Sequence, residues 1–377
     1  MAGYVSKALI VSSLSLFLNL PVTAQILAKK TNIPSNAAIT VRDITAQFKP
    51  RPSSNTRLNY ETWDKLLENM VLYTNLSTRT RAPKPQANVG SNLIFGHTSP
   101  YRLEGNKIPF SDLSDQYLEF LTLYRQDLEN TYNQLDITTL AKNEQLAYWL
   151  NLHNVAIIEQ IALAYPVKTP DTIKIGEGKV SLHDAKIITL NGTRVSLRDI
   201  REKIVYQHWN DPLVIYGFFL GNLGAPSIQN YAYTGENVKN ILGKNAEEFT
   251  NSLRGFTRGW VSEIYYDVQP YFFNDFETDL RKHLNQYMFD DVKEELARAE
   301  SFKKAKYEEI IADLSGGDSS RNTNFNDARG RSSKATMLAR LIEKRRLLAL
   351  KGLYNNGTVI IEDIASDSSS PDTNTVE

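Results

Sequence analysis

The most apolar part of the sequence is the stretch from residue 138 to residue 164, which predicts a long helix. After Leu146 nearly every residue of this stretch is apolar. A helix that is apolar on most sides has to be buried among other elements, because no broad face of it suits water. We therefore expect this helix at the centre of the fold, and Pro166 and Pro170 end it.

Other helices are predicted on both sides of this stretch from apolar residues at helical spacing. They cover residues 60–73, 111–135, 236–253 and 277–289, and the charged stretch 291–314 predicts one more. Ser196-Leu-Arg-Asp199 resembles a capping box, with aspartate in place of glutamate, and predicts a short helix that ends near Tyr206.

Short strands are predicted between these helices. Residues 186–190 and 193–195 flank Asn191-Gly192, a pair that favours a two-residue type I′ turn. Further strands are predicted over residues 213–220, 256–264 and 359–361. Helices and strands mixed in this order predict an α+β fold that is helix-rich with a small mixed or antiparallel sheet.

The N-terminal residues 1–24 have the pattern of a secretory signal peptide. Lys7 gives a positive start, residues 8–20 are mostly apolar, and Val22-Thr23-Ala24 resembles a cleavage site. The apolar run is shorter than the ~20 residues of a membrane-spanning helix, and no later segment reaches that length. We expect a secreted or periplasmic protein with no transmembrane segment; an uncleaved anchor is the alternative.

The rest of the chain divides by composition into one main domain and several flanking segments. The predicted parts are an extended N-terminal lead-in at 25–58, the domain at 59–314, a flexible linker at 315–333, a basic amphipathic helix and short strand at 334–364, and a disordered acidic tail at 365–377.

Composition excludes several classes of protein. The 377 residues include 43 basic and 43 acidic side chains. The chain therefore lacks the net positive charge on which sequence-independent binding to nucleic acids depends. It has no cysteine, which excludes thiol nucleophiles, disulfides and cysteine-ligated metal. No histidine pair has metal-site spacing and no glycine-rich phosphate motif is present, so we expect neither a metal nor a cofactor.

Two stretches combine polar residues with apolar surroundings. In Asn143–Asn154, the side chains of Asn151, His153 and Asn154 lie in the apolar helix, where buried polar groups need hydrogen-bond partners. They form either a structural network or the polar wall of a substrate pocket. In Asp211–Gln229, a predicted buried strand leads into a glycine-rich loop, a common place for functional residues.

We therefore name five candidate ligand-binding residues from these stretches and from the Tyr231–Thr234 segment that follows. They are Asn151, His153, Asn154, Asn222 and Tyr233.

Together these stretches resemble the domain of unknown function 547 family. Tyr148-Trp-Leu-Asn-Leu-His-Asn154 is similar to that family's F-W-x-N-x-Y/H-N helix, and Ser196-Leu-Arg-Asp-Ile200 to its S-L-x-D-I segment. Asp211–Phe218 is similar to the family's D-P-R-I-H-F segment, Gly224-Ala-Pro226 to its S-C-P and Tyr231–Thr234 to its A-Y-T. Two closing pieces of the family pattern are similar to Ser262–Tyr265 and to residues 273–276. The resemblance covers residues 60–314.

The departures from the family pattern bear on catalysis. Ala225 stands where the family has the cysteine of S-C-P, and its histidines fall at Glu202 and Ile215. If relatives use that cysteine as a nucleophile activated by histidine, neither partner is present here, and a methyl group cannot attack a carbonyl. A replacement pair of Ser227 and His208 is the alternative.

We therefore expect no catalytic residue and no metal, and interpret the chain as an exported pseudoenzyme candidate that binds a ligand or a protein. A peptide-like or cell-envelope molecule is the expected ligand. One alternative is a hydrolase or amide-transfer enzyme with a serine nucleophile. Another is an interaction protein that contacts a partner or a membrane surface through the basic helix Lys334–Leu353.

Overall fold

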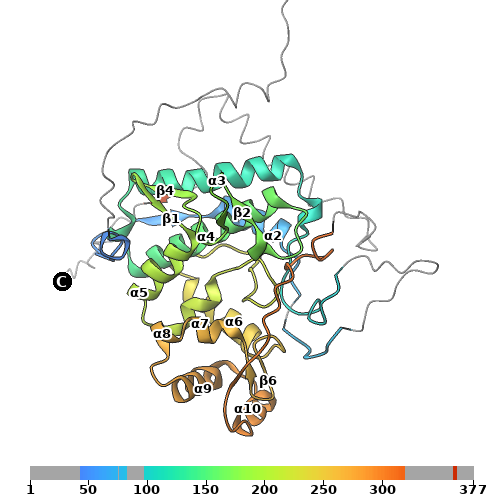
Figure 1. Ribbon diagram of the computed structural model, residues 1–377. Coiled ribbons are helices and arrows are strands. Elements are labelled where there is room, and N and C mark those ends of the chain that lie inside the picture. The colour runs from blue at the N-terminus through green and yellow to red at the C-terminus, as the bar shows by residue number, and fades with distance from the viewer. Residues whose placement is uncertain (1–42, 75, 83–96, 319–359, 363–377) are drawn as a thin grey trace, which may run out of the picture. The chain divides into compact units, whose positions relative to one another are not determined.

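The computed structural model describes residues 43–74, 76–82, 97–318 and 360–362 (Figure 1). The predicted signal peptide, the basic helix, the acidic tail and most of the linker lie outside the described residues. Among the helices that are described, none combines the length and the apolar character needed to cross a bilayer.

The predicted central helix is α4, Lys142–Ala164, and it is buried along nearly its whole length. The long helix α3, Asp115–Gln134, packs along it (Figure 1). Trp149 of α4 is buried and meets the ring of Phe48 edge-on at 5.3 Å. A buried ion pair between Arg125 of α3 and Glu159 of α4 joins the two helices. The prediction of a buried, mostly apolar helix is confirmed.

The remaining helices are shorter. They are α1 (Ile44–Gln47), α2 (Glu61–Met70), α5 (Tyr206–His208), α6 (Val238–Thr250), α7 (Glu263–Asp267), α8 (Gln269–Phe272), α9 (Phe276–Tyr287) and α10 (Asp290–Ala297). The 3₁₀ helices in the described part of the chain are η3 (Phe110–Asp112), η4 (Ile137–Thr139), η5 (Pro170–Thr172) and η7 (Pro212–Gly217). The element η6, Asp199–Val205, is a π-helix.

The strands form four small sheets in the described part of the chain. Three are antiparallel pairs: β1 (Arg57–Asn59) with β9 (Ile360–Glu362), β2 (Lys174–Ile175) with β3 (Val180–Ser181), and β4 (Ile188–Leu190) with β5 (Thr193–Val195). In the fourth, β7 (Trp260–Val261) pairs with β6 (Phe256–Thr257) in antiparallel and with β8 (Lys303–Lys304) in parallel orientation. The helix-rich α+β class with small mixed or antiparallel sheets is confirmed.

The local predictions around residues 186–206 are also confirmed. Asn191 and Gly192 have φ of 45° and 79°, and a type I′ turn needs positive φ at both central positions. The Ser196 Oγ accepts from the Asp199 backbone N–H at 3.1 Å, and an Asp199 carboxylate oxygen accepts from the Ser196 N–H at 2.8 Å. This is the predicted reciprocal cap, but the helix that follows begins as η6.

The prediction of a strand over residues 213–220 is wrong. This run begins as the 3₁₀ helix η7, and Asp211 caps it by accepting from the Leu213 N–H at 2.9 Å. Pro212 fixes a backbone angle that suits the first helical position. A short apolar run does not distinguish a buried strand from a buried helical turn. The burial of residues 213–220 could therefore be predicted from the sequence, but their conformation could not.

Two other predicted elements are shorter than expected. Of the strand predicted over residues 256–264, only 256–261 form β6 and β7, around a tight turn at Arg258 and Gly259, which both have positive φ. Residues 263 and 264 already belong to α7. The helix predicted over 291–314 is confined to α10; after it the chain returns in irregular, extended form past the other elements (Figure 1). We call residues 305–311 of this return the covering segment, because they lie over the glycine-rich loop.

Candidate functional site

The predicted site residue Asn151 lies on α4 and is bonded to the chain at Tyr233. Its Nδ2 donates to the Tyr233 carbonyl oxygen at 2.7 Å, and the Tyr233 N–H donates to its Oδ1 at 3.1 Å. Asn151 is buried. The amide therefore serves as a backbone surrogate that fixes the segment before α6.

Asn154, one turn further along α4, does the same for the end of η7. Its Nδ2 donates to the Gly217 carbonyl oxygen at 2.9 Å, and the Phe219 N–H donates to its Oδ1 at 3.1 Å. Together, Asn151 and Asn154 tie the central helix to two segments that follow it in the sequence. For these two residues, the structure therefore shows a structural network, which was one of the two interpretations open from the sequence; the other was the wall of a substrate pocket.

Tyr233 and Asn222 have contrasting surroundings. The Tyr233 hydroxyl accepts from Asn245 Nδ2 at 3.0 Å, and burial raises its pKa. The Asn222 side chain is buried, and neither of its polar atoms has a hydrogen bond of good geometry among the described residues. The Tyr307 hydroxyl lies close enough for the Asn222 amide to lower its pKa, although burial raises that pKa more strongly. Of the five predicted residues, Asn222 is the one whose side-chain amide has no hydrogen bond of good geometry in the described part of the chain.

The glycine-rich loop holds Ala225, which is buried, and the covering segment is bonded to it. The Leu223 N–H donates to the Ile310 carbonyl oxygen at 2.9 Å, and the Gly224 N–H donates to the Glu308 carbonyl oxygen at 2.9 Å. A Cβ on Gly224 would lie 2.7 Å from the Tyr307 ring. Glycine is thus required at 224 for the covering segment to lie this close.

A cavity of about 210 Å³ opens beside Gly224. Its walls include the rings of Tyr101, Trp260 and Tyr307, together with Arg81, Arg254 and Lys306. Trp260 is 46% exposed, so this wall is open to solvent. Aromatic faces with a few charged groups are typical of ligand sites, and the cavity adjoins the loop where the family pattern has its cysteine.

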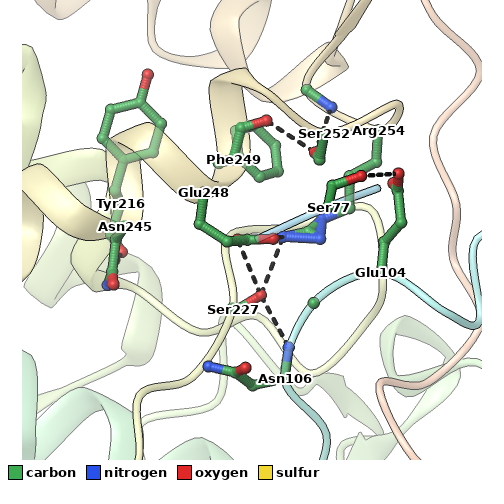
Figure 2. A network of polar contacts seen from close by, with 12 residues as sticks. Ser77, Glu104, Asn106, Tyr216, Ser227, Asn245, Glu248, Phe249, Ser252 and Arg254 are labelled. Atoms are coloured by element: carbon green, nitrogen blue, oxygen red, sulfur yellow. Dashed lines mark hydrogen bonds and ion pairs between the residues drawn. The ribbon is translucent and has the colours of Figure 1, made fainter. Parts of the chain in front are cut away.

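A buried polar network lies behind this cavity and contains Ser227 (Figure 2). The Ser227 Oγ accepts from Arg254 Nη2 at 2.9 Å and from the Asn106 N–H at 3.2 Å, and it donates to Glu248 Oε2 at 3.2 Å. Arg254 and Glu248 form an ion pair whose side chains are 2% and 10% exposed. Ser227 is therefore surrounded by charged groups that hold it in place.

Lys107 extends this network. Its Nζ donates to the carbonyl oxygens of Glu104 at 3.0 Å and Gly105 at 2.8 Å. Burial and the nearby Arg254 charge lower the Lys107 pKa to about 8. A Cβ on Gly105, which has a positive φ, would lie 2.6 Å from Arg254 Nη1. The network is closely packed around the two cations.

The alternative serine–histidine pair is not assembled in this structure. His208 Nε2 contacts the Thr45 carbonyl oxygen at 2.9 Å, whereas Ser227 makes the three contacts described above. Glu202 and Ile215, the positions of the family's histidines, cannot act as imidazole bases. Ile215 is also buried in the core.

His153, the fifth predicted residue, belongs to a chain of polar contacts through Arg201. Arg201 Nη1 donates to His153 Nε2 at 2.8 Å and faces His183 Nδ1 at 3.4 Å. Since the arginine is always the donor, both ring nitrogens accept, which leaves His153 Nδ1 to donate to Asn154 Oδ1 at 3.1 Å. Burial, reinforced by Arg201, lowers the His153 pKa well below its usual range.

The site thus contains residues that sequence reasoning did not select: Arg201, Glu248, Arg254 and Tyr307. The three charged residues of this set look like solvated side chains in a sequence, and only their burial distinguishes them. In the described part of the chain, no group of three or more histidine, aspartate or glutamate side chains is placed to hold a metal ion.

These features define a helix-rich α+β domain with a polar loop, a small cavity and a covering segment. Residues 137–250 match the model of the family described as Protein of unknown function, DUF547. The resemblance seen in the sequence is confirmed for this region, which holds the central helix, the capping box and the glycine-rich loop. Searches of the curated proteins and of the solved structures gave no match.

Proposed function

We propose that this protein is an exported, non-catalytic member of the DUF547 family that binds a ligand in the cavity beside Gly224. The observation that carries this proposal is the replacement of the reactive position by buried Ala225, next to a cavity that is still present. Loss of a nucleophile removes covalent catalysis but leaves the shape and the polar walls of a binding site.

The chemistry of the cavity favours a peptide-like ligand. Its aromatic walls offer stacking surfaces, and Arg81 and Lys306 at its lining offer donors to carbonyl or carboxylate oxygens. Its volume of about 210 Å³ lies below the ~300–1,000 Å³ of drug-sized sites. We therefore expect it to take one or two residues of a peptide, with the remainder outside.

The test is a thermal-shift screen of the full chain against cell-envelope peptides and glycans. A ligand that occupies the native state raises the melting temperature with concentration. Trp260→Ala removes an aromatic wall and should abolish the shift. Phe289→Ala is the matched control, because Phe289 is 39% exposed and does not line the cavity. No shift from any compound, or a shift that Trp260→Ala leaves unchanged, would contradict binding at this cavity.

Export is tested separately. Expression of the full chain with its first 24 residues should give material outside the cytoplasm whose N-terminus is Gln25, as determined by mass spectrometry. Recovery of the intact N-terminus in the cytoplasmic fraction would contradict this part of the proposal.

A second candidate function is hydrolysis or amide transfer by Ser227. The favouring observation is that its Oγ donates to the Glu248 carboxylate, an arrangement in which a base could accept the proton. Arg254 donates both to the same carboxylate and to the Ser227 Oγ, so it competes with Ser227 for Glu248 and opposes this role. Turnover of ester or amide substrates that Ser227→Ala abolishes would establish this alternative and overturn the non-catalytic one.

A further inference from the structure

The charged side chains that line the cavity beside Gly224 are unequally matched. The described lining contains the cations Arg81, Arg254 and Lys306 and the carboxylates Glu263 and Glu308. Arg254 forms an ion pair with Glu248, and Glu263 forms one with Lys304. Because each of these pairs is neutral, the balance of charge at the cavity depends on the three remaining residues.

Glu308 has hydrogen-bond donors that carry no charge. Its Oε2 accepts from the Ser99 hydroxyl at 2.8 Å, and its Oε1 accepts from the Ile310 N–H at 3.4 Å. The single negative charge of Glu308 can offset the charge of only one of the two remaining cations, Arg81 and Lys306. The cavity therefore keeps a positive charge that the described residues do not balance.

Arg81 is held against an aromatic ring. Its Cζ lies 5.7 Å from the centre of the Tyr101 ring, which lines the same cavity. Within the described structure, the Arg81 guanidinium has neither a hydrogen bond nor an ion pair. A guanidinium that stacks on a ring keeps its N–H donors in its own plane, where an anion can accept from them. Stacking also restricts the side chain in advance, which lowers the entropy that binding costs.

Lys306 supplies the second cation from the covering segment. It is exposed and forms no ion pair in the part of the chain that the structure describes. It directly precedes Tyr307, whose ring lies against Gly224. Lys303 adds positive charge nearby, because its Nζ lies 5.8 Å from the centre of the Trp260 ring. The cavity thus combines aromatic walls with cations, which suits a ligand that has an apolar part and a negative group.

The covering segment also limits how a peptide can lie in the cavity. The N–H groups of Leu223 and Gly224 are bonded to this segment, so a chain cannot pass between the segment and the loop. The volume of about 210 Å³ holds only one or two residues. A chain end needs only to enter such a cavity, whereas an internal segment would have to enter and leave through the same opening.

We propose that this cavity binds the C-terminal residue of a peptide, with the free carboxylate held by Arg81 and Lys306. A carboxylate carries one negative charge, which matches the unbalanced positive charge, and its two oxygens match the planar donors of arginine. A phosphate group, with a charge of roughly −1.5 to −2, would need more positive charge than the cavity keeps. This inference rests on the proposed function, since it specifies which end of the peptide-like ligand enters the cavity.

The experiment compares N-acetyl-phenylalanine with its C-terminal amide, which differs from it only in the carboxylate. Each compound is titrated into the full chain by isothermal titration calorimetry. We expect the acid to bind at least about tenfold more tightly than the amide, as for one hydrogen bond to a charged group. Equal affinities, or no binding of the acid, would overturn the proposal.

A second pair of compounds separates a C-terminal carboxylate from a side-chain carboxylate. N-acetyl-asparagine has its carboxylate at the C-terminus, whereas its isomer N-acetyl-aspartic acid α-amide has it on the side chain. We expect the first isomer to bind more tightly. Equal or tighter binding of the second isomer would overturn the choice of a C-terminal residue.

Variants assign the binding to residues. Arg81→Gln and Lys306→Gln should each weaken binding of the acid about tenfold and leave binding of the amide unchanged. Both side chains are exposed, so the variants should fold. The matched controls are Arg258→Gln and Lys239→Gln, which remove the same charge from exposed residues that do not line the cavity. Unchanged binding of the acid in either cavity variant, or an equal loss in its control, would contradict the assignment.

Failure of this inference and failure of the proposed function give different results. If the acid and the amide bind equally and Trp260→Ala abolishes both, the cavity remains the ligand site and the role of the two cations is removed. If binding of the acid depends on Arg81 but not on Trp260, the contact with the carboxylate remains and the cavity is removed as the ligand site.

Discussion

Asn151 and Tyr233 are joined by two hydrogen bonds, in which the side-chain amide of Asn151 binds both the carbonyl oxygen and the N–H of Tyr233. Asn151→Ala would leave both backbone groups buried and unpaired. Each such group costs about 1–3 kcal/mol, so for the two groups we expect a loss of about 2–6 kcal/mol in the free energy of unfolding, measured by urea denaturation.

Asn69→Ala is the control for this loss. Asn69 is half-buried on α2, where its Nδ2 makes a solvent-exposed hydrogen bond to the Lys65 carbonyl oxygen one turn earlier. Surface substitutions of this kind change stability by less than about 0.5 kcal/mol. A similar small effect of Asn151→Ala would contradict its structural role and return it to the candidate ligand-binding residues.

Stability should fall as the pH is lowered from 6.5 toward 4. Burial lowers the pKa of His97 and of His283 to about 4, whereas the unfolded chain takes up the same protons near pH 6.5. In this window the unfolded state binds more protons, so acid favours it, by up to about 1.4 kcal/mol per pH unit for each histidine. Urea denaturation at pH 7.5 and 5 measures the change.

The double variant His97→Gln/His283→Gln identifies the groups responsible. Glutamine does not titrate, so the variant should lose less stability between pH 7.5 and 5 than the wild-type protein does. His153 and His183, whose pKa is also lowered by burial, retain part of the effect. An unchanged pH dependence would mean that other buried groups account for it.

Gly224→Ala should loosen the covering segment. The added Cβ would lie 2.7 Å from the Tyr307 ring and 2.9 Å from the Glu308 backbone nitrogen, and crowding of this kind costs about 1–3 kcal/mol. Hydrogen exchange at Leu223 and Gly224, whose N–H groups bond to this segment, should become faster.

Gly243→Ala is the matched control for Gly224→Ala. Gly243 lies within α6, and a Cβ there meets no other atom. Alanine favours a helix over glycine by up to about 1 kcal/mol, so this variant should be as stable as the wild type or slightly more so. Equal behaviour of the two variants would contradict close packing of Tyr307 on the loop.

Arg254→Met should destabilise the protein strongly. The substitution leaves the Glu248 carboxylate buried without its cation, which costs about 3–5 kcal/mol for a broken buried pair. Arg298→Met breaks a pair with Glu294 whose side chains are 77% and 70% exposed, and it should cost less than about 1 kcal/mol. If urea denaturation gave similar losses of unfolding free energy for the two variants, the Arg254 network would be open to water.

The polar residues of α4 could be found from the sequence because they interrupt an apolar helix. The distant groups that they bind could not be found, since apart from the adjacent His153 the partners of Asn151 and Asn154 are backbone atoms of residues 217, 219 and 233. Backbone groups carry no sequence signature. The capping box and the Asn191-Gly192 turn were predicted because both depend on neighbouring residues alone.

Two kinds of feature could not be predicted. Residues 213–220 are apolar in either conformation, so burial alone did not reveal that η7 is helical. Arg201 and Arg254 look like ordinary surface charges in the sequence. Their burial follows from the return of the chain after α10 and from the packing of distant loops, which local pattern does not encode.

The pairing of β1 with β9 affects how the C-terminal region can be studied. Removing residues 330–377 to test the predicted basic helix would also remove the partner of Arg57–Asn59. That would leave an unprotected edge able to recruit other chains, so aggregation or false adhesion to vesicles could follow from the truncation itself. Charge-reversing substitutions within 334–353 would avoid this confusion and keep the hydrogen-bonded ribbon intact.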